Sequence, residues 1–557
     1  MQNSTRKFNR LKIILDKSLT VSNALDLACD IHGDKSLLSP DVSFSYDDIS
    51  SRNITANQLR IFCNKVSNFL INDIKLNRYD RIGIYKSNSL DYYLFGLAII
   101  RAGGIAVPIN SGVKGEGLKN YIDNLNITKM FVDSSTLTGI ANDFNDKDIF
   151  DSLIVVDEAQ GGFTCEVDLQ HALVSQSEIF DACPLNSDDI TLIVHTSGTT
   201  GFPKGVMHSS GTLTAGIKGQ FKIQPLKDSD KLLTVAPFNH FISFLSLYSA
   251  MLAGLRTWCM NSFDAEDALK IIEREKITTF FGFPDSYALM LKFGLDEFDL
   301  DSIRTWISGA DAAHEVHQRA FVKKGAYFRI MNKVLIKSIF IDTFGSSEVG
   351  FAALFRFTFS SSNLFQRFVG RPTFAGPKVK IANENGKTVS RNKVGFFMVK
   401  GPTIFKGYWN NNEKLNGVFK DSWFRTGDVG YRDTLGRYFH LDRDVDVIET
   451  ENGSAYTLVI EEHLLNYPGV AEVVAIGVPH PDRGYVPFAL VEPHIGKEIN
   501  VNEIKAWLNN KLQATMHVEE VICVACEGIP RGVTGKVLKR KLRSEYSGYY
   551  NINSITI

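Results

Sequence analysis

Apolar residues follow a recurring order along the chain, in which a helical pattern is followed by a short continuous run. Tyr92–Arg101 has apolar residues at helical spacing, and Ala102–Gly104 interrupts them before the apolar run Ile105–Ile109. The amphipathic segment Ala265–Arg274 precedes the run Ile277–Phe283 in the same way. Buried strands of parallel sheets are short apolar runs, and helices form the crossovers between them. The pattern therefore predicts an α/β fold with largely parallel sheets.

One stretch has the hydrophobicity of a membrane span. Leu232–Leu255 contains no Asp, Glu, Lys or Arg, but it includes Pro237, Asn239 and His240. A membrane helix needs about 20 consecutive apolar residues. We therefore predict a buried core helix preceded by a polar loop, and no stable insertion into a membrane.

The pattern changes near Leu441. Beyond it we expect short strands at 470–478 and 485–493, a helix at 501–512 and a basic end at 536–543. A chain of 557 residues exceeds what one core usually supports. The sequence thus predicts a large domain over residues 1–441, built from mixed α/β subdomains, and a small α+β domain over residues 442–557.

Composition narrows the functional classes. The formal net charge is −1, so no basic excess points to nucleic acid or to an anionic membrane surface. The seven cysteines are dispersed, and no secretory leader is apparent, which favours the cytoplasm. Cys523 and Cys526 form the one close pair, and the alternating run Val521–Ala525 around them is typical of a strand rather than of a zinc site.

A loop rich in glycine and hydroxyl groups follows the apolar run Ile190–Val194. Its sequence, HTSGTTGFPKG, occupies residues 195–205. Glycines let backbone N–H groups approach an anion, hydroxyls add donors, and Lys204 supplies a positive charge. A Walker A loop would need Ser or Thr after the lysine and a helix start, and here Gly205 follows Lys204 while Pro203 precedes it. The loop is therefore interpreted as a different kind of phosphate loop, with ATP as the expected polyphosphate.

This loop resembles the phosphate loop of the acyl-adenylate-forming superfamily, which includes acyl-CoA synthetases, adenylation domains and firefly luciferase. Further similar motifs follow in the family's order between about residue 40 and about residue 545. They are SGAD at 308–311, TFGSSE at 343–348, GYWN at 407–410, WFRTGD at 423–428, DRDVD at 442–446 and IPRGVTGK at 529–536. The resemblance implies a mobile C-terminal domain that carries a catalytic lysine, Lys536.

The resemblance also implies the residues that handle ATP and Mg²⁺. Thr196, Lys204, Glu348 and Lys536 would be catalytic, and Thr200 and Glu348 would hold Mg²⁺. Asp428 and Arg443 would bind the ribose, while Lys536 would neutralise charge between the attacking carboxylate and the α-phosphate. The complete set of ATP-binding residues implied is Thr196, Ser197, Gly198, Thr199, Thr200, Gly201, Lys204, Gly309, Ala310, Asp311, Thr343, Phe344, Gly345, Ser346, Ser347, Asp428, Arg443 and Lys536.

The acid pocket implied by the resemblance has His240, Phe241, Phe283, Gly309 and Gly345 around it. Members that activate amino acids carry an aspartate just after the His240 position, and here that residue is Phe241. An apolar residue leaves the α-ammonium group without a partner. We therefore expect a fatty, short-chain or aryl acid without an α-amino group.

Two functional alternatives follow. The first is an ATP-dependent acid–thiol ligase whose acceptor is CoA or a separate phosphopantetheinyl carrier protein, since no carrier domain follows Lys536. The second is a non-catalytic or repurposed nucleotide-binding relative that does not complete the thioester. Val445 in the hinge motif and the loop Glu449–Tyr456 depart from the family pattern and keep this alternative open.

Overall fold

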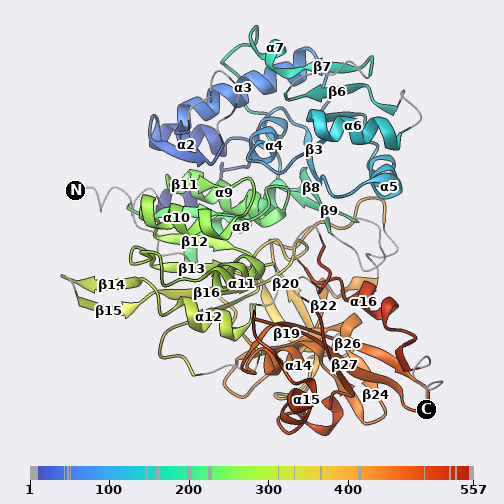
Figure 1. Ribbon diagram of the computed structural model, residues 1–557. Helices are drawn as coiled ribbons and strands as arrows, with labels where there is room; N and C mark the ends of the chain where they lie inside the picture. The colour runs from blue at the N-terminus through green and yellow to red at the C-terminus, as the bar shows by residue number, and fades with distance from the viewer. Residues whose placement is uncertain are drawn as a thin grey trace.

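The computed structural model describes residues 10–550 apart from 43, 45, 47–48, 50–51, 145–148, 158–162, 197–203, 224–228, 311–312, 332, 364–366, 412–414, 416, 495, 526–527 and 533–535. Two largely parallel sheets form the N-terminal part (Figure 1). The first has the order β7(Glu166–Asp168)-β6(Ser152–Val155)-β5(Lys129–Val132)-β3(Arg81–Lys86)-β4(Ile105–Asn110)-β8(Ile190–Thr196)-β9(Lys204–Ser209). All its pairs are parallel except that of β8 with β9.

The second sheet has eight strands, and its central pairs are parallel. Its order is β17(Leu354–Thr358)-β16(Ile339–Phe344)-β13(Thr305–Ser308)-β12(Thr279–Gly282)-β10(Lys231–Thr234)-β11(Arg256–Cys259)-β1(Ser36–Pro40)-β2(Ile54–Thr55). Only the two edge pairs, β1 with β2 and β16 with β17, are antiparallel. The two sheets confirm the predicted α/β class.

Helices cover both sheets and fill the space between them. They are α2(Ala24–His32), α3(Ala56–Asn72), α4(Asp91–Arg101), α5(Gly115–Leu125), α6(Ser134–Asp143), α7(Leu169–Leu173), α8(Ser210–Ile223), α9(Phe241–Ala253), α10(Ala265–Glu275), α11(Pro284–Phe293) and α12(Glu315–Phe321). Every residue of α4 is buried, which is why its sequence is apolar on all sides. A Cβ on Gly96 of α4 would lie 2.4 Å from Phe244 Cε1 of α9, so the glycine permits the close packing of these two helices.

The uncharged stretch is confirmed as a core element. Its first residues belong to the buried strand β10, and after a loop the chain forms the buried helix α9, which His240 caps by accepting a hydrogen bond from Ile242 N. Within the described residues, no helix has the length and hydrophobicity needed to cross a membrane.

A third sheet of the large domain is antiparallel, which the hydrophobic pattern did not predict. Its order is β18(Phe368–Gly370)-β23(Tyr438–Arg443)-β22(Trp423–Arg432)-β20(Gly395–Lys400)-β19(Lys378–Ala382), and β21(Phe419–Lys420) pairs with β22. A separate hairpin, β14(Ala326–Ile330) and β15(Lys333–Lys337), projects from the molecule (Figure 1).

The C-terminal part has its own sheet and core. The sheet order is β25(Gly453–Ala455)-β24(Ile448–Thr450)-β27(Gly484–Pro493)-β26(Val470–His480), and β28(Glu520–Cys523) pairs with β27. Helices α14(Thr457–Leu464), α15(Val501–Asn509) and α16(Lys539–Glu545) pack beside it. The chain passes from the third sheet to this one through a 3₁₀ turn at Asp444–Asp446, close to the predicted boundary at 441/442.

Candidate active site

The glycine-rich loop connects two antiparallel strands. β8 ends at Thr196 and β9 begins at Lys204, and these two residues are paired across the hairpin. Since a strand rather than a helix follows the loop, the rejection of a Walker A motif is confirmed. The side chain of Thr196 and the residues Ser197, Gly198, Thr199, Thr200 and Gly201 lie outside the described part of the structure, as does Asp311.

Tyr408 lies between the two predicted catalytic residues Lys204 and Glu348. The GYWN segment runs along the outer side of β9, where Met207 N donates to Gly407 O and Trp409 N donates to Gly205 O. This pairing places the Tyr408 ring 5.6 Å from Lys204 Nζ. The Tyr408 hydroxyl donates to Glu348 Oε1 at 3.1 Å. Sequence reasoning quoted the motif but assigned no role to Tyr408.

The segments SGAD and TFGSSE come together at one sheet edge. β13 ends at Ser308 and its parallel neighbour β16 ends at Phe344, so the residues that follow both strands meet at the carboxyl edge. Thr343 Oγ1 donates to Ser308 O at 2.8 Å. A Cβ on Gly309 would lie 2.7 Å from Thr343 Oγ1, and Ala310 has a left-handed φ of 73°. The two segments therefore approach each other at a position where glycine is required.

The predicted ribose-binding pair, Asp428 and Arg443, is also brought together. The two residues are directly opposite in β22 and β23, and Arg443 Nε lies 3.4 Å from Asp428 Oδ1. His440 Nε2 lies 3.4 Å from the same oxygen. Burial opposes ionisation of Asp428, but Arg443 and His440 outweigh it and lower its pKa to about 2. Asp428 is thus an anion at neutral pH and a strong hydrogen-bond acceptor.

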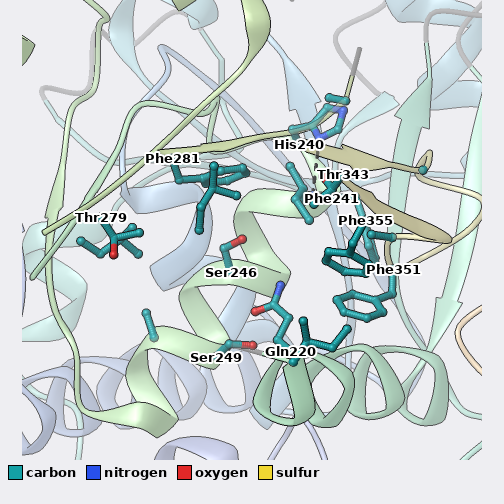
Figure 2. A pocket seen from close by; sticks show the side chains of 18 of the residues that line it. Gln220, His240, Phe241, Ser246, Ser249, Thr279, Phe281, Thr343, Phe351 and Phe355 are labelled. Carbon is teal, nitrogen blue, oxygen red and sulfur yellow. Dashed lines mark hydrogen bonds between the residues drawn. The ribbon is translucent and has the colours of Figure 1, made fainter. Parts of the chain in front are cut away.

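A cavity of about 110 Å³ extends from this edge into the core between α8, α9 and the second sheet (Figure 2). His240, Phe241, Ala310, Thr343 and Gly345 line it near the carboxyl ends of the strands. Its walls are largely aromatic, with the side chains of Phe241, Phe281, Phe351 and Phe355. Asp230 is the one carboxylate among the described lining residues, and it pairs with Arg304.

Two predicted pocket residues are not part of this lining. Phe283 packs edge-on against His240 with ring centroids 5.2 Å apart. It therefore supports His240 from outside the lining, at the end of the cavity near the carboxyl ends of the strands, which we call the mouth. Gly309 faces Thr343 instead of the cavity. Phe281 of β12 contributes an aromatic ring to the wall, whereas Phe283 lies beyond the end of this strand.

The mouth of the cavity lies within reach of the charge of Lys536. Burial, and to a smaller extent the positive charge of Lys536, lowers the pKa of His240 to about 3. Lys536 of the C-terminal part is thus near enough to His240 for its charge to act at this end of the cavity.

Buried and partly buried ion pairs join the two domains in this arrangement. The Glu462 carboxylate of α14 lies 3.0 Å from His314 Nδ1 and 3.2 Å from Arg367 Nη1. It also accepts a hydrogen bond from Glu315 N at 2.9 Å. Burial opposes ionisation of Glu462, yet these three groups hold its pKa well below the ordinary value. Two further contacts join Lys292 to Glu492 at 3.0 Å and Asp285 to Arg531 at 3.2 Å. Apart from Arg531, which lies in the IPRGVTGK motif, no sequence motif pointed to these residues, because partners separated by 95 or more residues leave no local pattern.

His208 is another residue that sequence reasoning missed. It is fully buried on β9 and stacks on Phe241 with ring centroids 4.1 Å apart. Burial lowers its pKa to about 3, so the ring is neutral. His208 thereby fixes the aromatic wall of the cavity from behind.

The site thus combines the β8–β9 hairpin, the ionised Asp428 carboxylate and a cavity with largely aromatic walls. Residues 39–409 match the AMP-binding enzyme family and residues 459–536 match the AMP-binding enzyme C-terminal domain. The chain belongs to the AMP-binding enzyme family.

Characterised relatives cover most of the chain. It is 26% identical over 497 residues to a 3-aminoavenalumate diazotase from a Streptomyces species, covering 84% of this chain and 85% of the relative. It is 30% identical over 368 residues to a feruloyl-CoA synthase from an Amycolatopsis species, covering 65% and 71%. It is 29% identical over 369 residues to a long-chain-fatty-acid–CoA ligase of Bacillus subtilis, covering 65% and 63%.

Solved structures agree with this assignment. ATP-bound MatB from Rhodopseudomonas palustris superimposes with a TM-score of 0.81 at 25% identity, covering 96% of this chain and all of that one. The anthranilate CoA ligase AuaEII in complex with anthranoyl-AMP gives a TM-score of 0.83 at 22% identity, covering 96% and 99%, which shows the shared fold. The predicted acyl-adenylate-forming fold is confirmed, and of the two functional alternatives the ATP-dependent acid–thiol ligase is confirmed.

Proposed function

We propose that the chain adenylates an aryl or fatty acid that lacks an α-amino group and then transfers the acyl group to CoA. The observation that carries the proposal is the position of Lys536, whose charge acts on His240 at the mouth of a cavity with aromatic walls. Relatives named for ferulate and for long-chain fatty acids favour the same acids. CoA is favoured as the acceptor because several relatives are named as CoA synthases or CoA ligases, and a separate carrier protein is the alternative acceptor.

The predicted residues have the chemistry that adenylation needs. Bringing a carboxylate to the α-phosphate of ATP joins two anions, so positioning and neutralisation of charge supply most of the rate. We assign Lys204 with the loop 196–201 to the phosphates, Asp428 and Arg443 to the ribose, and Lys536 to the reacting groups. In this assignment the segments at 309–311 and 343–347 surround the adenine.

Glu348 fits a Mg²⁺ ion bound together with ATP. Mg²⁺ commonly takes one or two carboxylates and completes its shell with phosphate oxygens and water. In the described residues, no cluster of three or more His, Cys, Asp or Glu side chains forms a metal site. Glu348 Oε1 accepts from Tyr408, which orients the carboxylate, and Thr200 is assigned as the hydroxyl partner. The ion would screen the negative charges of the phosphates, and the side chains of Lys204 and Lys536 would add positive charge from the protein.

The rejection of α-amino acids follows from the cavity lining. Phe241 is 3% exposed and stacks on neutral His208, so neither residue offers a counter-charge to an ammonium group. Asp230 is paired with Arg304 at the amino end of β10, away from the His240 end of the cavity.

The proposal also includes a domain boundary at 441/442 and a cytoplasmic location. The described cysteines are free thiols, as in a reducing compartment.

Acid-dependent exchange of pyrophosphate into ATP tests the proposal without an acceptor. A panel should pair simple carboxylic acids with their 2-amino analogues and include fatty, short-chain and aryl acids. We expect exchange with aryl or fatty acids and a preference of at least about a hundredfold over the 2-amino analogues, since an unpaired buried charge costs several kcal/mol. A preference for an α-amino acid would overturn the assignment of Phe241.

A further inference from the structure

The deep end of the cavity carries polar side chains that the proposed adenylation does not use. Gln220 of α8 and Ser249 of α9 lie at the end opposite His240, and Ser246 of α9 lies between the two ends (Figure 2). Between the two ends the walls are the rings of Phe241, Phe281, Phe351 and Phe355. The cavity is thus largely apolar along its length and polar at the end opposite His240.

The hydroxyl of Ser249 has no hydrogen-bond partner in the described part of the protein, although the residue is only 5% exposed. Gln220, which is 8% exposed, also lines this end of the cavity. Buried polar groups are nearly always paired in folded proteins. The unpaired Ser249 hydroxyl, with the Gln220 side chain at the same end, therefore points to a ligand that supplies its partner.

Three other polar residues of the lining, Asp230, Lys231 and Thr279, are already paired. Asp230 accepts from Arg304 and from Thr278, and Lys231 Nζ donates to Glu275 O at 2.6 Å. Thr279 Oγ1 lies 2.9 Å from Thr305 Oγ1. A charged group on the ligand would consequently meet no unused counter-charge, whereas a neutral hydrogen-bonding group would meet the Ser249 hydroxyl and the Gln220 amide.

The helix that carries both serines sets the length of the ligand. Ser246 and Ser249 come six and nine residues after His240, which corresponds to about 9 Å and about 13 Å along the helix axis at 1.5 Å per residue. The reacting carboxylate belongs at the His240 end, where the charge of Lys536 acts. A ring separated from the carboxyl group by two carbon atoms spans this distance, and a benzoic acid is too short.

We propose that the acid, within the function proposed above, is an aryl acid of phenylpropenoid length. It carries a neutral hydrogen-bonding group, such as a hydroxyl, at the ring position farthest from the carboxylate. Ser249 and Gln220 bind that group, and Ser246 lies on α9 between them and His240. The aromatic rings of Phe241, Phe281, Phe351 and Phe355 pack against the ring of the acid.

Pyrophosphate exchange with three matched acids tests this inference: 4-hydroxycinnamate, 4-methylcinnamate and cinnamate. The methyl compound has nearly the same volume as the hydroxy compound and forms no hydrogen bond. We expect kcat/KM for 4-hydroxycinnamate to exceed that for 4-methylcinnamate by at least about tenfold, because the methyl group leaves the buried polar groups unpaired.

Ser249→Ala and Gln220→Leu should each reduce this ratio severalfold, chiefly through 4-hydroxycinnamate. Ser243→Ala is the matched control on the same helix, because Ser243 donates to Pro237 O and does not line the cavity. It should leave the ratio unchanged. Equal rates for the hydroxy and methyl acids, or a ratio unaffected in both cavity variants, would overturn the inference and leave the proposed function standing. Exchange with no acid of the wider panel would overturn both.

Discussion

The Tyr408 hydroxyl donates a hydrogen bond to Glu348 Oε1 at 3.1 Å, while the Tyr408 ring lies 5.6 Å from Lys204 Nζ. One side chain thus positions the carboxylate assigned to Mg²⁺ and the lysine assigned to the phosphates. Burial and the neighbouring Glu348 raise the pKa of Tyr408 far above its ordinary value, so the hydroxyl remains a donor throughout the physiological range.

Tyr408→Phe should lower the exchange rate by about tenfold and raise the Mg²⁺ concentration needed for half-maximal rate, because a hydrogen bond to a charged group contributes about 1.5–3 kcal/mol. The ring, and with it the contact to Lys204, is retained. Tyr438→Phe is the matched control, since the Tyr438 hydroxyl donates to Val379 O within the third sheet. An unchanged Mg²⁺ dependence in Tyr408→Phe would refute the positioning role.

Glu348→Gln should raise the Mg²⁺ requirement more strongly than Tyr408→Phe, because the amide keeps an acceptor for Tyr408 but loses the charge that binds the ion. Binding of ATP through Asp428 should persist in part. Titration of the exchange rate with Mg²⁺ checks this. If the half-saturating concentration is the same as in the unmodified protein, a different group holds the metal.

Glu462→Gln should weaken the contact between the domains. The substitution leaves Arg367, which is 5% exposed, without its anionic partner, and breaking a buried pair in this way costs about 3–5 kcal/mol. We expect the rate of adenylation to fall while thioester formation from added acyl-adenylate and CoA is largely retained. An equal loss in both half-reactions would indicate a general loss of stability instead.

The Asp428 carboxylate predicts a pH dependence of stability. Its pKa of about 2 in the folded protein lies below the ordinary value of about 3.9, so its contribution is present above pH 4 and is lost as the pH falls toward 2. Asp428→Asn should be less stable by about 2–3 kcal/mol at pH 6. In denaturant titrations the difference should shrink between pH 4 and pH 2. A difference that stays constant over that range would contradict the ion-pair account.

Gly96→Ala should destabilise the fold by about 1–3 kcal/mol, because the added Cβ would lie 2.4 Å from Phe244 Cε1 in a packed core. Gly139→Ala in α6 is the control: a Cβ there meets nothing within 4 Å, and alanine favours a helix over glycine. Thermal unfolding of the two variants should therefore shift in opposite directions. A Gly96→Ala variant of unchanged stability would mean that α4 and α9 pack less closely.

The sequence predicted those features that local patterns encode. Apolar runs located β4, β8 and the helices α4 and α10, and short motifs located Lys204, Glu348, Asp428 and Lys536. The sequence did not predict the antiparallel third sheet. Its strands are connected by loops and not by crossover helices, so the pattern of a helix followed by a strand is absent there. Tyr408 and Glu462 were missed for a related reason: their roles depend on partners distant in the sequence, and only folding brings these groups together.

The central claim is that Lys536 acts on the reacting carboxylate and α-phosphate at the cavity mouth. Lys536→Ala, measured by acid-dependent pyrophosphate exchange with ATP binding and thermal unfolding as controls, tests it most directly. Since the contact is made mainly in the transition state, the account predicts a fall in exchange of at least about a hundredfold with ATP binding and stability nearly unchanged. Exchange close to that of the unmodified protein would contradict the account and remove Lys536 from the mechanism.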